Sequence, residues 1–326
     1  MLQKTITRVP TLPDPVVDTE QFAQQLRYAL ANIGAAYIPV SSISDRTLLG
    51  NLHTFFSLNE TQKRSLAEEL SSPWQGVYIA LGEEQLGDNQ EDYKEVLDLN
   101  LENGTYAQWI RTLKAQRSHQ GKSNPTVPKG SLAHQRELAA VSQSLCQIFD
   151  VFQTQANHVL TAIETAYEQP GSLVHNHGKN STLRLLHYPP ASHFKLGSIR
   201  LAAHQDYSGI TLLWQDSTGG LEILTPDRKW IPIDIPPGCI GVIASEVMQR
   251  WSGDTLHAAP HRVRVTNAQQ LQKTRYSIAF FCETNHDCVV QPGSLVKSSD
   301  ASAEKPIVIK TFLRKKYNQI FSNLNI

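Results

Sequence analysis

Three residues in the second half of the chain could bind a metal ion together. His204 and Asp206 stand two residues apart, and His261 begins the run His-Arg-Val-Arg-Val. Two neutral imidazoles and one carboxylate are the ligand set typical of non-haem ferrous iron, and they leave coordination positions open. The three residues therefore predict an iron(II) site at which a cosubstrate and dioxygen can also bind.

The spacing of these residues predicts how strands present them. Residues two apart in a strand face the same side, so His204 and Asp206 can reach one point. His261 follows His204 by 57 residues, which fits several intervening strands. A lone His-x-Asp pair is usually only a polar part of the surface, so the third ligand matters. We prefer His261 because a strand-like run follows it directly. The alternatives are His257, His193 and His286.

A second pair of residues could bind a carboxylate. Arg275 and Ser277 are again two apart, within the run Arg-Tyr-Ser-Ile-Ala-Phe-Phe. A planar guanidinium binds a carboxylate through two hydrogen bonds, and a serine hydroxyl adds a donor. This pair predicts a binding site for the distal carboxylate of a dicarboxylate. An Arg-x-Ser sequence alone, however, more often belongs to the solvated face of a strand.

Composition narrows the class of partner. The 326 residues include 30 Lys plus Arg and 30 Asp plus Glu, so no excess of charge indicates a nucleic acid or a membrane surface as partner. No apolar run approaches a membrane span, and the first 15 residues lack the order of a signal peptide. The four cysteines form no CxxC pair, which favours free thiols. We expect a cytoplasmic, monomeric protein that acts on a small molecule.

The first half of the chain predicts helices around one strand. Apolar residues recur at helical spacing and capping residues precede them. Segment 71–128 is rich in Gly, Asn and Gln, which indicates loops with short elements. The predicted helices are 18–34, 44–58, 59–69 and 131–167, and the predicted strand is 35–40.

The second half predicts a β-rich fold. Short apolar runs alternate with turns rich in Pro and Gly, as in an antiparallel sandwich or jelly roll. A basic amphipathic helix is expected at 307–321. The predicted strands are 182–188, 210–214, 221–224, 240–244, 262–266 and 276–281.

Five phrases together resemble a known family. They are Leu-Arg-Leu-Leu-His-Tyr-Pro-Pro (183–190), His-Gln-Asp-Tyr-Ser-Gly-Ile-Thr-Leu-Leu (204–213), Gly-Gly-Leu-Glu-Ile (219–223), Pro-His-Arg-Val (260–263) and Arg-Tyr-Ser-Ile-Ala-Phe-Phe (275–281). Their order resembles the iron(II)- and 2-oxoglutarate-dependent oxygenases of the isopenicillin N synthase-like group. The first half is similar to the N-terminal region of the same family.

The resemblance implies a fold and a division of the chain. It implies a mainly β protein with helices, whose double-stranded β-helix core, a cupin-like jelly roll, is braced by N-terminal helices and a long central helix. Residues 1–326 would form a single catalytic unit. Its parts would be an N-terminal α/β region (1–130), a bracing helix (131–168), the double-stranded β-helix core (171–295) and a C-terminal helix (300–326).

The resemblance also implies residue roles. His204, Asp206 and His261 would be the iron ligands, and Arg275 with Ser277 would bind the distal carboxylate of 2-oxoglutarate. Tyr188 would donate its phenol to this cosubstrate. In some plant members an asparagine two residues before that tyrosine helps to hold 2-oxoglutarate, whereas this chain has Leu186.

The implied reaction couples oxidative decarboxylation of 2-oxoglutarate by dioxygen to hydroxylation, desaturation or oxidative cyclisation of a small molecule, in specialised metabolism. One alternative is an iron oxidase of the same fold that needs no 2-oxoglutarate, and another is a non-catalytic barrel that binds a ligand. Residues close to the metal in sequence are candidates for substrate contact: Arg200, Tyr207 and Phe281. Segment 71–128 and the C-terminal helix are candidates for a lid.

Overall fold

The computed structural model describes residues 8–42, 44–69, 74–84, 92–101, 132–296 and 305–322. Most of segment 71–128 lies outside these ranges, so the prediction that it forms a lid falls largely outside the described residues. The same is true of residues 297–304 and 323–326, which belong to the predicted C-terminal region.

Two antiparallel sheets form the core of the described structure. From β4 to β11, successive strands alternate between the two sheets, apart from the β7–β8 hairpin, and this winding produces the expected jelly roll. The seven-stranded main sheet has the order β1 (Ala35–Pro39), β9 (Cys239–Ala244), β6 (Ile210–Gln215), β11 (Arg275–Cys282), β4 (Thr182–Tyr188), β3 (Glu95–Leu101) and β2 (Trp74–Ile79). The minor sheet has the order β5 (Ile199–His204), β10 (His261–Arg264), β7 (Leu221–Leu224) and β8 (Trp230–Pro232). A separate pair joins β12 (Val289–Val290) to β13 (Ile307–Val308).

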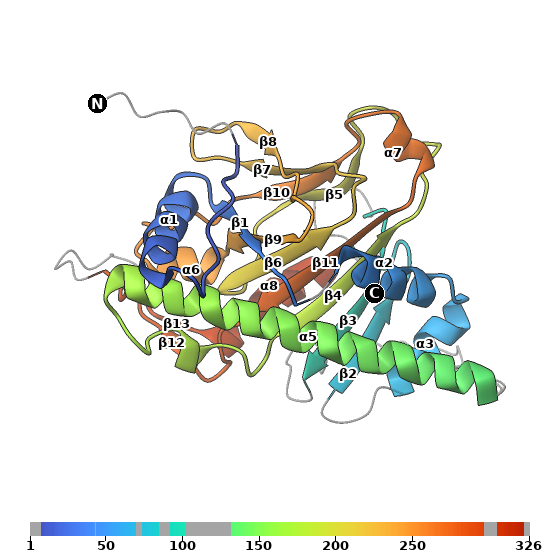
Figure 1. Ribbon diagram of the computed structural model, residues 1–326, viewed down its shortest axis with the longest axis horizontal. Helices are drawn as coiled ribbons and strands as arrows, with labels where there is room; N and C mark the ends of the chain where they lie inside the picture. The colour runs from blue at the N-terminus through green and yellow to red at the C-terminus, as the bar shows by residue number, and fades with distance from the viewer. Residues whose placement is uncertain are drawn as a thin grey trace.

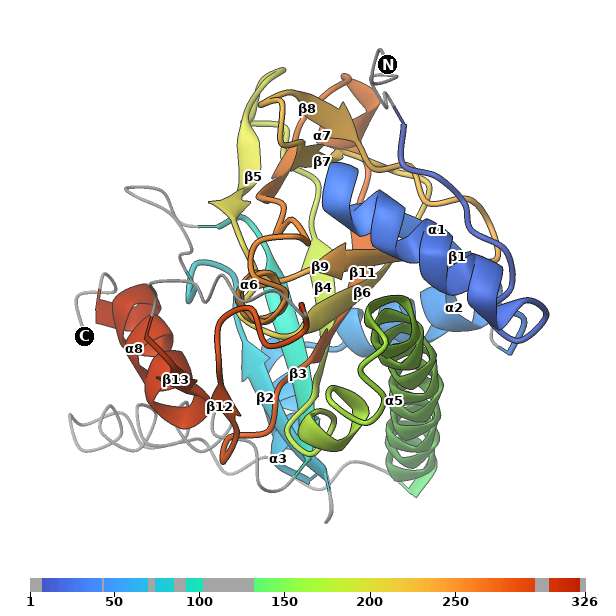
Figure 2. The ribbon, with the colours of Figure 1, turned by 90° about the vertical axis from the view of Figure 1, so that its left-hand side faces the viewer.

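Helices surround this core on two sides (Figures 1 and 2). Figure 2 shows α1, α2 and α5 on one side of the main sheet and α8 with β12 and β13 on the other. The helices are α1 (Thr19–Asn32), α2 (Asp45–Phe56), α3 (Glu60–Glu69), α5 (Leu132–Tyr167), α6 (Glu246–Trp251), α7 (Gln269–Gln272) and α8 (Ile309–Ser322), with a 3₁₀ turn at Val174–Asn176.

The N-terminal helices begin where capping residues predict. The Asp18 carboxylate accepts a hydrogen bond from the backbone N–H of Gln21 at 2.9 Å, and the Ser44 hydroxyl accepts one from Thr47 at 3.2 Å. Such caps satisfy backbone donors that a helix start leaves unpaired. The apolar faces of α1 and α2 are buried, as their periodicity predicts.

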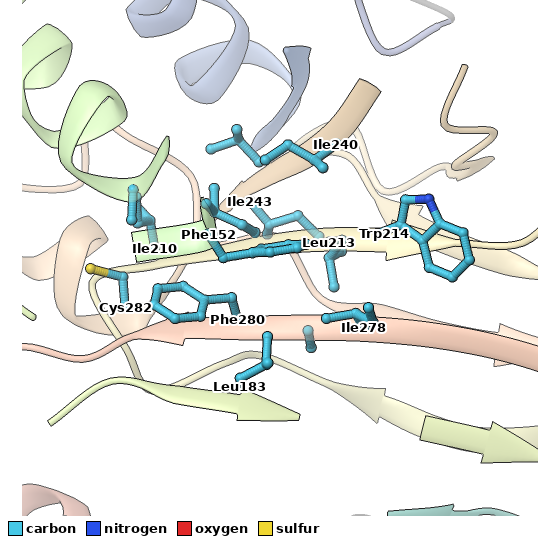
Figure 3. Packing of buried hydrophobic residues seen from close by; sticks show 14 of the residues in the cluster. Phe152, Leu183, Ile210, Leu213, Trp214, Ile240, Ile243, Ile278, Phe280 and Cys282 are labelled. Carbon is cyan, nitrogen blue, oxygen red and sulfur yellow. The ribbon is translucent and has the colours of Figure 1, made fainter. Parts of the chain in front are cut away.

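The long helix α5 braces the outer face of the main sheet. Phe149 and Phe152 contact Phe280 of β11, with ring centroids 5.1 and 6.0 Å apart. All three side chains are buried, and Figure 3 shows Phe152 next to Phe280 within the apolar layer. The aromatic contacts leave the opposite face of β11 for the pocket described below.

A glycine allows the turn after α1 to lie against the segment that precedes His261. Gly34 has a φ of +85°, a conformation that favours glycine, and a Cβ there would come within 2.6 Å of the Cβ of Ala259. The close approach helps to fix the start of β10.

Some elements differ from the sequence prediction. β2 and β3 lie where we expected loops with short elements, and β13 occupies the start of the predicted C-terminal helix. The four cysteines are free, as predicted. No helix among the described residues combines the length and apolar character needed to cross a membrane.

Candidate metal centre and carboxylate site

His204, Asp206 and His261 meet at one point between the two sheets. His204 ends β5 and His261 begins β10, and the two residues are directly opposite in this antiparallel pair. The Asp206 Oδ1 atom lies 3.5 Å from Nε2 of His204 and 3.7 Å from Nε2 of His261. One donor atom from each residue lies within 4.8 Å of the others, so the group could hold a metal ion.

We expected Asp206 to lie in the same strand as His204, but it lies beyond the end of that strand. β5 ends at His204, so Asp206 lies in the following loop and not in a strand. Its backbone carbonyl accepts a hydrogen bond from the N–H of Glu246 at 2.9 Å, and its Oδ2 accepts one from the Thr211 hydroxyl at 2.5 Å. These bonds leave Oδ1 directed at the imidazoles.

The backbone sets the tautomer of both imidazoles. Nδ1 of His204 lies 2.9 Å from the carbonyl oxygen of Ala202, and Nδ1 of His261 lies 3.3 Å from that of Ala259. A carbonyl can only accept, so each Nδ1 carries a proton, and in the neutral imidazole each Nε2 has a lone pair available for a metal ion. Metal-binding histidines are usually oriented in this way. The donor set therefore fits iron(II).

Burial and mutual contact shift the pKa values of the three groups. Burial lowers the pKa of His261 to about 4, against the attraction of Asp206, so its imidazole is neutral at neutral pH. Burial would raise the pKa of Asp206, but the two histidines and Thr211 outweigh it and hold that pKa well below its usual range. Burial would lower the pKa of His204, but Asp206 favours the protonated imidazole, from which it would accept a hydrogen bond, and this outweighs burial and raises the pKa.

The other candidate histidines lie elsewhere. Nε2 of His257 lies 3.2 Å from the carbonyl of Leu224. His193 packs against Phe194, with ring centroids 4.5 Å apart, and His286 lies 3.4 Å from Glu283. Within the described part of the chain, only His261 joins His204 and Asp206 in such a group.

A pocket connects this group to Arg275 and Ser277, and all five residues line it. The Arg275 guanidinium is buried and donates hydrogen bonds of 2.9 Å to the carbonyl of Gly219, the Ser277 hydroxyl and Oε1 of Gln215. These bonds fix its plane, so a charged, oriented donor faces the pocket. Gln215 was not predicted from the sequence, although it lies at an inward position of β6, two residues after Leu213.

Tyr188 lies beside this arginine. The register of β4 and β11 pairs Tyr188 with Arg275 and Leu186 with Ser277. The Arg275 guanidinium carbon lies 4.7 Å from the centre of the Tyr188 ring, and both residues line the pocket with Leu186. The phenol and the guanidinium therefore share one end of the pocket.

Of the three residues expected to contact substrate, one lines the pocket and two do not. Phe281 lines the pocket. Arg200 and Tyr207 are not among the described residues that line it, so the structure does not bring them to the cavity with Phe281. The buried Arg200 guanidinium donates to the carbonyl of Pro189, behind Tyr188, and Tyr207 packs edge-on against Phe312 of α8. Proximity to the metal ligands in the sequence did not predict these placements, because the side chains of neighbouring residues at the end of a strand point in different directions.

Family comparisons agree with this arrangement. Residues 179–284, which include all five predicted metal and carboxylate ligands, match the model of the 2OG-Fe(II) oxygenase superfamily. Residues 8–120 match the model described as the non-haem dioxygenase in morphine synthesis N-terminal region. The chain belongs to the 2OG-Fe(II) oxygenase superfamily. It is an iron(II)- and 2-oxoglutarate-dependent dioxygenase.

Curated relatives include several fungal enzymes. The oxygenase is 27% identical to proline hydroxylase buaE of Petromyces alliaceus over 299 residues, which cover 87% of this chain and 88% of the relative. It is 37% identical to 2-oxoglutarate-dependent dioxygenase htyE of Aspergillus rugulosus over 145 residues, which cover 41% of this chain and 44% of the relative.

Solved structures share the fold. Neurospora crassa T7H in complex with alpha-KG superimposes with a TM-score of 0.73 at 22% identity, covering 95% of this oxygenase and 96% of T7H. The dioxygenase for auxin oxidation from rice superimposes with a TM-score of 0.70 at 19% identity, covering 96% of each chain. The arrangement of sheets and helices is therefore that of known 2-oxoglutarate oxygenases.

Proposed function

We propose that this oxygenase couples oxidative decarboxylation of 2-oxoglutarate to hydroxylation, desaturation or oxidative cyclisation of a small molecule in specialised metabolism. One observation carries the proposal: a single pocket is lined by His204, Asp206 and His261 and also by Arg275 and Ser277. A relative named as a proline hydroxylase supports a small organic substrate and hydroxylation as the first outcome to test.

In this proposal each group in the pocket has a defined task. His204, Asp206 and His261 hold iron(II), which, when bound, supplies the redox chemistry that activates dioxygen at the expense of 2-oxoglutarate. Arg275 and Ser277 bind the distal carboxylate of 2-oxoglutarate. Tyr188 donates its phenol to the same molecule.

The chain also orients the reactants and excludes water. Apolar side chains of Leu186, Leu213 and Ala279 also line the pocket. An apolar wall strengthens the ionic contacts inside the pocket and keeps solvent from the reacting groups. Among the three residues considered for substrate contact, we propose that Phe281 faces the substrate.

We further propose that the protein acts as a monomer in the cytoplasm, without a nucleic acid or membrane partner. The equal numbers of acidic and basic residues support the absence of these two partners, because net charge attracts neither a nucleic acid nor a membrane surface.

Succinate formation tests the reaction. We expect the purified protein to form succinate from 2-oxoglutarate only with iron(II) and oxygen, and His204→Ala to form it at least ~100-fold more slowly, because a ligand is lost. The exposed His53 on α2 provides the control variant His53→Ala, which should match the parent protein. A second readout is anaerobic titration with iron(II), expected to give one ion per chain for the parent and the control.

The alternatives predict other results. An oxidase that needs no 2-oxoglutarate would consume oxygen with its substrate and form no succinate. A non-catalytic barrel would bind no stoichiometric iron, and His204→Ala would change nothing. Either result would remove the proposed function.

A further inference from the structure

Arg200 of β5 is a buried cation that has no acidic partner in the described part of the chain. Only 2% of the residue is exposed, and no carboxylate of the described residues forms an ion pair with its guanidinium. The guanidinium donates to the backbone carbonyls of Pro189 and Gln270, and its Nε is buried without a hydrogen-bond partner among the same residues. Because a charge loses its hydration on burial, buried cations are normally paired with acids. Arg200 therefore carries a charge that an anion from outside the chain could balance.

Arg200 lies next to the end of the pocket proposed for 2-oxoglutarate. Its guanidinium carbon is 5.4 Å from the centre of the Tyr188 ring, and that of Arg275 is 4.7 Å from the same point. The two guanidinium carbons are therefore no more than about 10 Å apart. Tyr188 and Arg275 line the pocket, whereas Arg200 is not among the described residues that line it. Arg200 can therefore act on a bound molecule through its charge and through the position of the Tyr188 ring.

Arg275 also lacks an acidic partner among the described residues. Its three hydrogen bonds go to the carbonyl of Gly219, the hydroxyl of Ser277 and the side-chain amide of Gln215, and all three groups are neutral. The end of the pocket next to Tyr188 is thus flanked by two guanidinium groups, neither of which is in an ion pair with a described residue.

The other charged groups near this end have partners of their own. Lys94, which lies close to Tyr188, pairs with Glu84 at 2.8 Å and with Asp92 at 2.9 Å. Asp216 accepts hydrogen bonds of 2.7 and 2.8 Å from two backbone N–H groups, and its attraction for Arg200 is smaller than the repulsion between Arg200 and Arg275. These groups therefore leave the charge of Arg200 without a close counterion.

The guanidinium of Arg200 remains charged at neutral pH. Burial lowers the pKa of Arg200 to about 10, since the attraction of Tyr188 offsets burial only in part and Arg275 opposes it. At a separation of about 10 Å and an effective dielectric constant of about 20, one unit charge changes the affinity for another by about tenfold. The distal carboxylate of 2-oxoglutarate, bound at Arg275, would bring a negative charge to about this distance. A 2-oxo acid without that carboxylate would bring none.

We propose that Arg200 makes the cosubstrate site selective for a dicarboxylate, because its charge attracts the distal carboxylate of 2-oxoglutarate from behind Tyr188. Arg200 is then a positioning residue that acts on the cosubstrate without touching it, and not the substrate contact expected from the sequence. This inference rests on the proposed function, because it assumes that 2-oxoglutarate binds at Arg275 and Ser277.

Binding of two 2-oxo acids tests the selectivity. 2-Oxopentanoate has the carbon chain of 2-oxoglutarate but lacks the distal carboxylate. Calorimetry on protein that holds Mn(II) measures the Kd of each acid without turnover, by competition where binding is weak. We expect Arg200→Met to weaken binding of 2-oxoglutarate about tenfold and that of 2-oxopentanoate less than about twofold. In turnover, the KM for 2-oxoglutarate should rise by the same factor with little change in kcat.

Three further variants separate charge from structure. Arg200→Lys keeps the charge and should bind 2-oxoglutarate within about threefold of the parent protein, whereas Arg200→Gln keeps N–H donors without the charge and should behave like Arg200→Met. The matched control is Arg64→Met, since the Arg64 guanidinium carbon lies 5.3 Å from the centre of the Tyr78 ring but Arg64 does not line the pocket. All variants should bind Mn(II) as the parent does, which shows that the metal ligands are undisturbed.

Several results would overturn the inference. Arg200→Met binds 2-oxoglutarate as tightly as Arg64→Met does, it weakens both 2-oxo acids equally, or Arg200→Lys loses as much affinity as Arg200→Met. If Arg200→Met fails to fold, Arg200→Gln is judged by the same criteria, and failure of both to fold would show a structural role instead. In each case the parent protein would still form succinate from 2-oxoglutarate, whereas failure of the proposed function would abolish that reaction in the parent itself.

Discussion

The three predicted metal ligands His204, Asp206 and His261 form the metal face of the pocket. Each depends on a hydrogen-bond partner that keeps its free donor atom directed at the site. Backbone carbonyls of Ala202 and Ala259 hold the two imidazoles, and the Thr211 hydroxyl holds Asp206. Thr211 belongs to a group of buried hydroxyls, with Ser245 at 3.2 Å and Ser208 at 3.3 Å. Because these hydroxyls can reorient, they can satisfy one another while Thr211 donates to the carboxylate.

Removal of the Thr211 hydroxyl should weaken metal binding. Thr211→Val keeps the shape of the side chain but leaves Oδ2 of Asp206 without this donor. We expect affinity for iron(II) to fall about 10- to 100-fold, as is usual for loss of a residue that orients a ligand. Anaerobic titration with iron(II) measures the change.

Thr225→Val is the matched control for this variant. Thr225 is buried and bonded to Lys229 in the turn between β7 and β8, away from the metal face. Equal affinities for the two variants would show that the Thr211 bond does not support the site.

At the scale of elements, His177 joins four parts of the fold. Its Nδ1 donates to the carbonyl of Leu173 at 2.8 Å, and its Nε2 accepts from the Thr284 hydroxyl at 2.9 Å, just after β11. Its ring stacks on Trp251 of α6 at 5.5 Å. Gly209, just before β6, leaves room for the ring, because a Cβ there would lie 2.1 Å from Nε2.

This histidine should make stability depend on pH. Burial lowers the pKa of His177 to about 4 from 6.5, so the unfolded chain takes up a proton before the folded chain does. The stabilisation is therefore present above pH 6.5 and is lost as pH falls toward 4. The shift corresponds to about 3 kcal/mol in all, of which about 2 kcal/mol is lost between about pH 7.5 and about pH 5.

Urea unfolding at those two pH values measures the loss. His177→Gln cannot be protonated, so its free energy of unfolding should fall by about 2 kcal/mol less than that of the parent protein. His53→Gln, on the surface of α2, should keep the dependence of the parent. The explanation fails if His177→Gln and the parent lose stability equally.

At the scale of the whole molecule, the two faces of β11 have different roles: one lines the pocket and the other packs in the buried core. Residues 275, 277, 279 and 281 of this strand line the pocket, whereas residues 278 and 280 belong to the buried core on the other face. A strand places alternate side chains on opposite faces, so one segment can bind ligands on one side and pack against α5 on the other.

Neighbouring phenylalanines of β11 should therefore have different tasks. Phe280→Ala removes a fully buried ring that contacts Phe149 and Phe152 and should lower the free energy of unfolding by about 3–5 kcal/mol. Phe281→Ala should lower it by about 1 kcal/mol, because that ring is partly exposed in the pocket. Urea unfolding of both variants measures the difference, and similar losses would contradict the division of faces.

The sequence by itself was sufficient for local structure. Capping residues and apolar periodicity predicted α1, α2 and α5 within one or two residues at each end. Alternation placed Arg275 and Ser277 on one face of β11, and the structure shows them bonded to each other. Such features depend on neighbours in the chain, so the sequence alone contains them.

The polar strands were harder to predict. β3 carries Asp98 and Asn100 on the face where hydrophobic residues would be expected, because that face meets charged groups of β4. Inward polar residues interrupt the alternation from which strands are recognised.

Only the tertiary structure decided which residues meet. The sequence left His257, His193 and His286 as alternatives to His261, and the register of β5 with β10 places His261 opposite His204. Pairing between strands separated by dozens of residues depends on the packing of the whole core, and a shift of one residue would turn His261 away from the pocket. The residue types thus determined the chemistry of this protein, and strand register determined where that chemistry is assembled.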